Sequence, residues 1–352
     1  MTTDMKDYGF CGDFAAESAQ VEGLFPARII SQYKGLYRAV SASGELYAEI
    51  SGKLRFEAKE PVDLPAVGDF VLLDRQDDEC GNAVIQRVLP RKSVFMRKAA
   101  GETVQGQVVA ANIDVVFICM ALDNDFNLRR LERYMALAWD SGAQPVVVLT
   151  KADVCENTAE KLREAQRVAA GADVLAVSAL ETDGCERVKK YIETGCTAAL
   201  IGSSGVGKST LINRLTGSDA LRTGETRGDG RGRHTTTNRE LILLEGGGLV
   251  IDTPGMRELG VLGDSEGLER SFSDVEQITR RCRFADCSHT GEPGCAVRAA
   301  LESGELEPER WESFLKLKAE ADYAGDRRAY AAEKEKRFKK IMKEYKSGQN
   351  RW

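Results

Sequence analysis

The chain has 352 residues, of which 42% are hydrophobic and 30% are charged, as in soluble globular proteins. This length suffices for two or three domains, and no apolar run approaches the roughly 20 residues of a membrane helix. The formal net charge of −6 argues against non-specific binding to nucleic acid. Because no apolar run is long enough to cross a membrane, we expect no association with membranes.

The N-terminal residues 1–21 lack apolar periodicity, and we expect them to form a flexible lead. Residues 1–13 carry Asp4 and Asp7 and have no apolar core, so we expect them not to be a signal peptide. The nine cysteines, an odd number without an export signal, favour thiols or metal ligands over disulfides. We expect a cytoplasmic monomer.

Residues 22–98 contain short alternating runs separated by turn signals such as Ser43-Gly44. Five strands in this length predict a small barrel of the oligonucleotide-binding (OB) type, although other small barrels would also fit. The predicted strands are Ala27–Tyr33, Tyr37–Val40, Leu46–Ile50, Asp69–Leu73 and Ala83–Val88.

Basic and aromatic side chains in this segment could form an RNA-binding face, as in many OB barrels. Half of the aromatic side chains could equally belong to the barrel core. The candidates are Tyr33, Lys34, Tyr37, Arg38, Arg55 and Phe56, followed by Arg91, Lys92, Arg97 and Lys98.

Residues 108–262 alternate buried strands with helices, which predicts a doubly wound α/β domain with its ligand site at the carboxyl ends of the strands. The predicted strands are Ile113–Met120, Pro145–Thr150, Asp173–Val177, Ala198–Ile201, Glu240–Leu244 and Leu249–Asp252. The predicted helices are Leu128–Asp140, Thr158–Ala170, Glu186–Ile192 and Thr210–Leu215.

Two strand ends in this domain predict a guanine pocket. In Thr150-Lys151-Ala152-Asp153, the Asp153 carboxylate can accept hydrogen bonds from guanine N1–H and the exocyclic amine, a pair of donors that adenine lacks. The Lys151 stem can lie along the base plane. Ser178 and Ala179 can close the pocket with backbone N–H groups on guanine O6. Taken alone, the tetrapeptide would also fit a helix start with a surface charge.

The run from Gly202 to Ser209 matches GxxxxGK[ST] between a strand and a helix, which predicts a phosphate-binding loop. Its glycines let backbone N–H groups turn toward one phosphate chain, and the helix adds the positive end of its dipole. Lys208 would reach the β- and γ-phosphates, and Ser209 would ligate Mg²⁺. The predicted binding residues are Gly202, Ser203, Ser204, Gly205, Val206, Gly207, Lys208, Ser209 and Thr210.

Two further segments carry candidate groups that respond to the γ-phosphate. In Asp252-Thr253-Pro254-Gly255, Asp252 would hold Mg²⁺ through water and the Gly255 N–H could sense the γ-phosphate. In the Arg- and Gly-rich segment Arg227–Thr237, we expect Thr236 to complete the Mg²⁺ shell when GTP is bound.

Residues 263–352 are predicted to form a helical, zinc-binding domain. Its pattern Cx₄CxHx₅C supplies three thiolates and one imidazole, which fill a tetrahedral Zn²⁺ site completely and make it structural. The tail Arg327–Trp352 carries ten Lys or Arg against three Glu, which suits either a polyanion or a solvated helix. The candidate ligands are Cys282, Cys287, His289 and Cys295.

The guanine elements precede the phosphate loop, which resembles the order in a circularly permuted GTPase. With a barrel in front and a Cys/His cluster behind, residues 22–345 resemble the ribosome small subunit-dependent GTPase A family. The resemblance implies GTP hydrolysis stimulated by the 30S subunit, contact with 16S rRNA, and a role in late maturation of that subunit. The implied ligands are GTP or GDP, Mg²⁺ and one structural Zn²⁺.

Two residues depart from the ordinary GTPase pattern. Met256 stands where many GTPases have the glutamine that orients water. The family is similar in this respect, and its switch histidine, which His234 matches, is thought to take part in catalysis. We therefore expect His234 to orient water. Thr150 replaces the commoner Asn, and we expect it to weaken a hydrogen bond between loops.

Two other interpretations stay open. The chain could be an RNA-binding assembly factor that uses GTP only as a structural ligand. It could also be a P-loop ATPase or nucleotide kinase, against which Asp153 argues.

Overall fold

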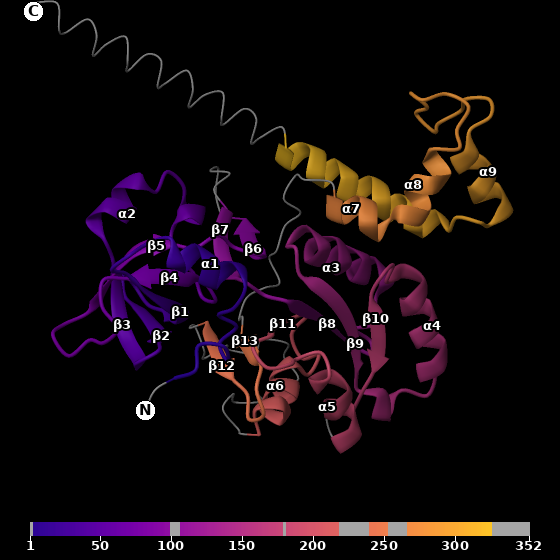
Figure 1. The fold of residues 1–352 in the computed structure, drawn as a ribbon. Helices are drawn as coiled ribbons and strands as arrows, with labels where there is room; N and C mark the ends of the chain where they lie inside the picture. Colours follow the sequence, from indigo (N-terminus) through magenta and orange to yellow (C-terminus); the bar gives the residue numbers. More distant parts are fainter. Residues whose placement is uncertain (1–2, 99–105, 179–180, 218–238, 253–265, 326–352) are drawn as a thin grey trace, which may run out of the picture.

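A computed structural model describes residues 3–98, 106–178, 181–217, 239–252 and 266–325. These residues form a β-barrel, an α/β domain and a helical C-terminal unit (Figure 1). Within the described ranges, no helix has the length and apolar character needed to cross a membrane.

The barrel consists of β1 (Phe25–Gln32), β2 (Tyr37–Ser41), β3 (Gly44–Ile50), β4 (Phe70–Leu73) and β5 (Ala83–Val88). Its strand order is β1-β2-β3-β5-β4, and β4 pairs back with β1 to close the ring. Only the β3–β5 pair is parallel within this ring. The short helices α2 (Gly52–Glu57) and η1 (Pro61–Asp63) connect β3 to β4. The closed five-stranded ring confirms the predicted barrel.

The N-terminal segment is folded against the barrel, so the prediction of a flexible lead is wrong for residues 3–21. This segment contains helix α1 (Asp13–Ala19), whose Phe14 is 3% exposed and packs against Phe70 with ring centroids 4.2 Å apart. Phe10 also contacts the Phe70 ring. Two aromatic anchors hold a segment that is too short to show helical periodicity.

The α/β domain contains one sheet in the order β10-β9-β8-β11-β13-β12. All neighbours are parallel except the β12–β13 pair. The strand order reverses between β8 and β11, which places ligand-binding loops at the carboxyl ends of these two strands. The strands are β8 (Val115–Ala121), β9 (Gln144–Thr150), β10 (Asp173–Ala176), β11 (Thr197–Ile201), β12 (Glu240–Leu243) and β13 (Leu249–Asp252).

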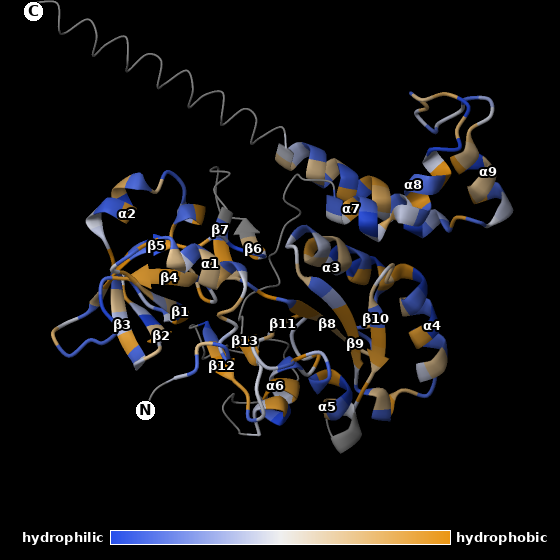
Figure 2. Cartoon of the chain, viewed as in Figure 1, coloured by the Kyte–Doolittle hydropathy of each residue, from blue (hydrophilic) through white to orange (hydrophobic). Residues whose placement is uncertain are grey.

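Helices cover both faces of this sheet, which confirms the doubly wound class. Side chains of α3 (Leu128–Asp140) and α4 (Thr158–Val168) belong to one apolar core. Those of α5 (Thr182–Lys189) and α6 (Lys208–Thr216) belong to a second core on the opposite face. Figure 2 shows apolar residues concentrated on the strands between them.

The barrel and the α/β sheet are joined by a strand pair and a hairpin. β12 pairs with β1 at Ser31 and Glu240, and Arg38 bonds to both Glu45 and Glu240. The hairpin of β6 (Val94–Lys98) and β7 (Gly106–Ala111), which the sequence did not predict, also links the two parts. The Ala111 N–H donates to the Val67 carbonyl beside the barrel, and the Val94 N–H donates to the Ser141 carbonyl at the end of α3. The barrel therefore continues the edge of the sheet.

The C-terminal unit is helical, as predicted, and packs on α3 (Figure 1). It comprises α7 (Glu266–Ser271), α8 (Ser273–Thr279), α9 (Ala296–Ser303) and a helix over residues 308–325. Arg310 is 6% exposed and bonds to Glu132 of α3 at 2.9 Å and to Asp274 of α8 at 2.6 Å. A charged cluster thus joins this unit to the α/β domain.

Candidate nucleotide site and metal centre

The predicted phosphate loop connects β11 to α6, and three of its glycines lie in the left-handed region. Their φ angles are 142° at Gly202, 77° at Gly205 and 91° at Gly207. A Cβ at Gly202 would lie 2.2 Å from the carbonyl oxygen of Cys119. The loop conformation therefore requires glycine, and it ends at the amide-rich start of α6.

The Lys208 ammonium folds over this loop, donating to the carbonyl oxygens of Gly202 at 2.7 Å and Ser203 at 2.5 Å. Ser204 and Ser209 are exposed, Ser203 and Thr210 are half-buried, and Val206 is buried beneath them. The exposed side chains of Ser204 and Ser209 thus lie on the same loop as the Lys208 ammonium. This combination suits a phosphate chain with a divalent cation.

The predicted guanine motif is hydrogen-bonded directly to the predicted phosphate loop. Thr150 ends β9, is 2% exposed, and donates its hydroxyl hydrogen to the carbonyl oxygen of Val206 at 2.6 Å. We expected threonine in place of asparagine to weaken the hydrogen bond between these two loops. The structure does not show this weakening, because the threonine hydroxyl reaches the Val206 carbonyl of the neighbouring loop. This hydrogen bond fixes the distance between the candidate base site and the candidate phosphate site.

Lys151 and Asp153 follow at the surface. Lys151 has a left-handed backbone, with φ 59° and ψ 38°, and its ammonium lies 2.8 Å from Asp123. Asp153 is exposed in the short helix η2 (Ala152–Val154). The Ala152 N–H donates to the Val177 carbonyl, which places the buried Ser178 beside the motif.

Asp123 is a neighbour of this motif that the sequence did not predict. Its only signal was an acidic residue just after β8, a strand that lies between β9 and β11 in the sheet. The predicted residues Ala179, His234, Thr236 and Gly255 lie outside the described residues. Asp252 is the last residue of β13, where it pairs with Glu240.

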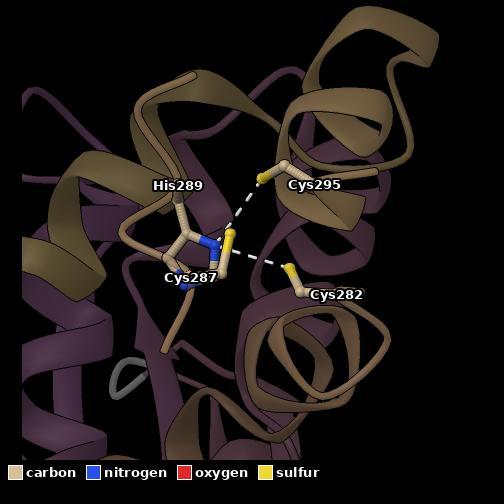
Figure 3. Close-up of side chains that lie close together, drawn as sticks. All are labelled: Cys282, Cys287, His289 and Cys295. Atoms are coloured by element: carbon tan, nitrogen blue, oxygen red, sulfur yellow. Dashed lines mark hydrogen bonds between the residues drawn. The ribbon is translucent and has the colours of Figure 1, made fainter. Parts of the chain in front are cut away.

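The four candidate metal ligands come together beside α8 and α9 (Figure 3). Nδ1 of His289 lies 3.5 Å from the Cys282 sulfur and 3.7 Å from the Cys295 sulfur, and all four ligand atoms lie within 4.8 Å of one another. A tetrahedral Zn²⁺ with bonds of about 2.0–2.3 Å separates its ligand atoms by roughly 3.3–3.8 Å. The donor set and spacing fit zinc.

The surroundings of this cluster favour a thiolate at Cys282 and a fixed imidazole ring, whereas burial raises the pKa of the Cys287 thiol to about 11. Burial opposes ionisation of Cys282, but hydrogen bonds from the Ala296 and Val297 amides outweigh it and lower the pKa of the thiol. The Glu292 carboxylate accepts hydrogen bonds from three backbone N–H groups of the ligand loop. Trp311 packs edge-on against the His289 ring at 5.4 Å.

The predicted RNA-binding face is only partly available. Tyr37 is 3% exposed in the barrel core. Arg38 is engaged with two glutamates and Arg91 is bonded to Asp69, whereas Lys92 is exposed although its ammonium lies over the Phe14 ring.

Besides Lys92, four of the predicted RNA-binding residues that the structure describes are exposed. Phe56 is 91% exposed and Tyr33 is 40% exposed, and Lys34 and Arg55 are exposed beside them in sequence. The side chains of Arg97 and Lys98 lie outside the described part. The remaining face still combines aromatic and basic groups.

Known proteins resemble this chain over most of its length. The profile of the RsgA GTPase family matches residues 88–262. Small ribosomal subunit biogenesis GTPase RsgA 2 of Lactiplantibacillus plantarum is 47% identical over 327 residues, covering 92% of this chain and 91% of that protein. Small ribosomal subunit biogenesis GTPase RsgA of Opitutus terrae is 45% identical, covering 87% and 86%.

Solved structures agree with the permuted fold. YjeQ from Thermotoga maritima has a TM-score of 0.63 and 27% identity, covering 84% of this chain and 97% of that one. YloQ, described as a circularly permuted GTPase, has a TM-score of 0.60 and 22% identity over 87% of this chain and 96% of its own, which bears on the fold alone. This chain belongs to the RsgA GTPase family.

Proposed function

We propose that this chain is a cytoplasmic GTPase that assists biogenesis of the small ribosomal subunit, as the names of its relatives state of those proteins. The observation that carries the nucleotide assignment is the 2.6 Å bond from Thr150 to Val206. It holds a base-recognition motif and a phosphate loop together. The guanine preference comes from the acceptor pair of the Asp153 carboxylate.

In this proposal, the phosphate loop binds the β- and γ-phosphates through its backbone N–H groups and the Lys208 ammonium. Ser209 and Thr236 would ligate Mg²⁺ and Asp252 would hold it through water, and the ion would neutralise charge that develops on the phosphates. The Gly255 N–H contacts the γ-phosphate. Met256 has no group that can orient water, so His234 takes that role.

The protein without its partner is expected to hydrolyse GTP slowly, because this histidine must be brought to the γ-phosphate. The 30S subunit, contacted through 16S rRNA, is the proposed activator of the monomer. Trans-activation of a GTPase can raise the rate by about 10³- to 10⁵-fold. The barrel supplies RNA contacts, and a single Zn²⁺ stabilises the C-terminal unit.

The test is steady-state GTP hydrolysis by the purified protein alone, with 30S subunits and with 50S subunits. Stimulation by 30S alone supports both the reaction and the partner. GTP binding without turnover under any condition would instead indicate that the nucleotide is a structural ligand. Equal competition by ATP would contradict the guanine site.

A matched variant tests the catalytic assignment. His234→Ala should abolish the stimulation by 30S subunits and leave the dissociation constant for GTP nearly unchanged, because the ring acts on water and not on the nucleotide. Stimulation that survives in this variant would contradict the role of His234.

A further inference from the structure

We propose that Asp123 is a positioning residue for guanine recognition, whose carboxylate holds the Lys151 ammonium so that the lysine stem can lie along the base. This inference rests on the proposed GTP site and adds a residue that lies outside its two sequence motifs. The residue acts through Lys151 and does not itself contact the nucleotide.

The two carboxylate oxygens of Asp123 have different partners. Oδ2 accepts a hydrogen bond from Nζ of Lys151 at 2.8 Å. Oδ1 accepts one from the backbone N–H of Asp125, also at 2.8 Å. One oxygen thus fixes the carboxylate to its own loop, and the other reaches the guanine motif.

The loop of residues 122–127 is itself anchored on both sides. The Leu122 N–H donates to the carbonyl oxygen of Thr150, the last residue of β9, at 2.9 Å. Lys161 of α4 donates to the Leu122 carbonyl at 3.1 Å. At the other end, the Asn127 side chain caps α3 by accepting from the Arg130 N–H. These hydrogen bonds fix the backbone of the loop that carries Asp123.

The pair is suited to orientation more than to stability. The side chains of Lys151 and Asp123 are 39% and 38% exposed, and ion pairs this open to water contribute little to folding. Burial acts to raise the pKa of Asp123, but the bonds from Lys151 and Asp125 outweigh it and lower the pKa. The carboxylate is charged at neutral pH and available to the ammonium.

Without this carboxylate, the half-exposed ammonium of Lys151 is free to turn toward water. The lysine stem then has no fixed conformation before guanine binds. Part of the binding free energy is therefore spent on ordering this side chain. GTP and GDP share the base, so both should lose affinity by the same factor. The phosphate chemistry is separate, and the turnover number should stay unchanged.

The test measures fluorescent GTP and GDP binding to the full-length wild type, Asp123→Ala, Asp123→Asn and the control Glu186→Ala. The control breaks another exposed pair, Glu186 with Lys189 at 2.9 Å, on α5. We expect both dissociation constants to rise roughly tenfold in Asp123→Ala, as for the loss of one charge-assisted hydrogen bond. Asn keeps an acceptor and should restore part of the affinity, and the control should match the wild type.

Turnover with saturating GTP and 30S subunits should stay within about twofold of wild type in Asp123→Ala, because only binding is affected. Unchanged nucleotide affinity in Asp123→Ala, with normal binding by the wild type, overturns this inference alone. Equal loss in Asp123→Ala and Asp123→Asn also overturns it, since the acceptor would then be irrelevant. Absence of GTP binding by the wild type overturns the proposed function as well.

Discussion

Among single residues, Asp153 is the one on which the proposed selectivity for guanine depends. In Asp153→Asn one acceptor oxygen becomes an N–H₂ donor, which opposes the guanine amine but complements the C2 carbonyl of xanthine. We expect the affinity for GTP to fall by about 10²-fold or more and binding of XTP to appear. Competition against a fluorescent guanine nucleotide measures both dissociation constants.

A neighbouring acid provides the control for this exchange. Glu156 is exposed three positions further along the chain, and Glu156→Gln removes the same charge from the same region. This variant should keep the wild-type preference for GTP. A folded Asp153→Asn protein that binds neither less GTP nor more XTP would contradict the placement of Asp153 at the base.

The backbone conformation of the predicted phosphate loop could be predicted, because the spacing of its glycines determines local geometry, as at Gly202 and Gly207. Asp123 could not be predicted, because its contact with Lys151 joins strand ends that are adjacent only in the folded sheet. The expected weakening of the hydrogen bond between loops at Thr150 was also wrong. Its bond to Val206 depends on the distance between two loops, which sequence spacing does not determine.

At the scale of elements, alternation and helical periodicity identified the barrel strands and the strands and helices of the α/β domain. Helix α1 and the β6–β7 hairpin were missed. Seven residues of α1 are too few to establish a period, and its anchoring depends on Phe70 in a distant strand. The β12–β1 pair joins residues about 200 positions apart, which no local pattern encodes.

The ligand loop between α8 and α9 has little apolar content, so its fold should depend on the metal. A structural Zn²⁺ contributes on the order of 10 kcal/mol to folding of a small unit. We expect Cys287→Ser to lose the one bound zinc per chain and to expose residues 280–295 to protease. Zinc release to a chromogenic chelator and limited proteolysis measure the two effects.

Cys80→Ser serves as the control for this change, because Cys80 is exposed in the barrel and lies outside the cluster. It should retain full zinc content and protease resistance. Nucleotide binding should survive in both variants, since the phosphate loop lies at the other side of the sheet from the cluster's core contacts. Full zinc content in Cys287→Ser would contradict the ligand set.

At the scale of the whole molecule, the barrel and the nucleotide-binding sheet form one hydrogen-bonded series from β10 to β4. β12 lies at their junction, pairing with β13 on one side and with β1 on the other. A displacement of β12 must therefore disturb either the strand that ends at Asp252 or the barrel. The shared strand β12 thus connects the barrel to the strand that leads to the proposed nucleotide site.

Arg28 is the residue at which these parts meet. Its side chain is fully buried in β1 and donates to the carbonyl oxygens of Tyr8, Gly68 and Asn112 and to the Thr197 hydroxyl at the start of β11. Burial lowers its pKa to about 10, so the guanidinium remains charged at neutral pH. Arg28→Met should remove these four hydrogen bonds of the buried guanidinium and cost about 3–5 kcal/mol.

The midpoint of urea unfolding measures this loss, and Arg38→Ala is the matched control. Arg38 lies in the neighbouring strand β2 and is 31% exposed, so loss of its ion pairs should cost less than about 1 kcal/mol. Comparable losses in the two variants would mean that any arginine at this junction has the same effect. A large loss confined to Arg28→Met would identify the buried guanidinium as the contact that fixes the barrel to the strand feeding the phosphate loop.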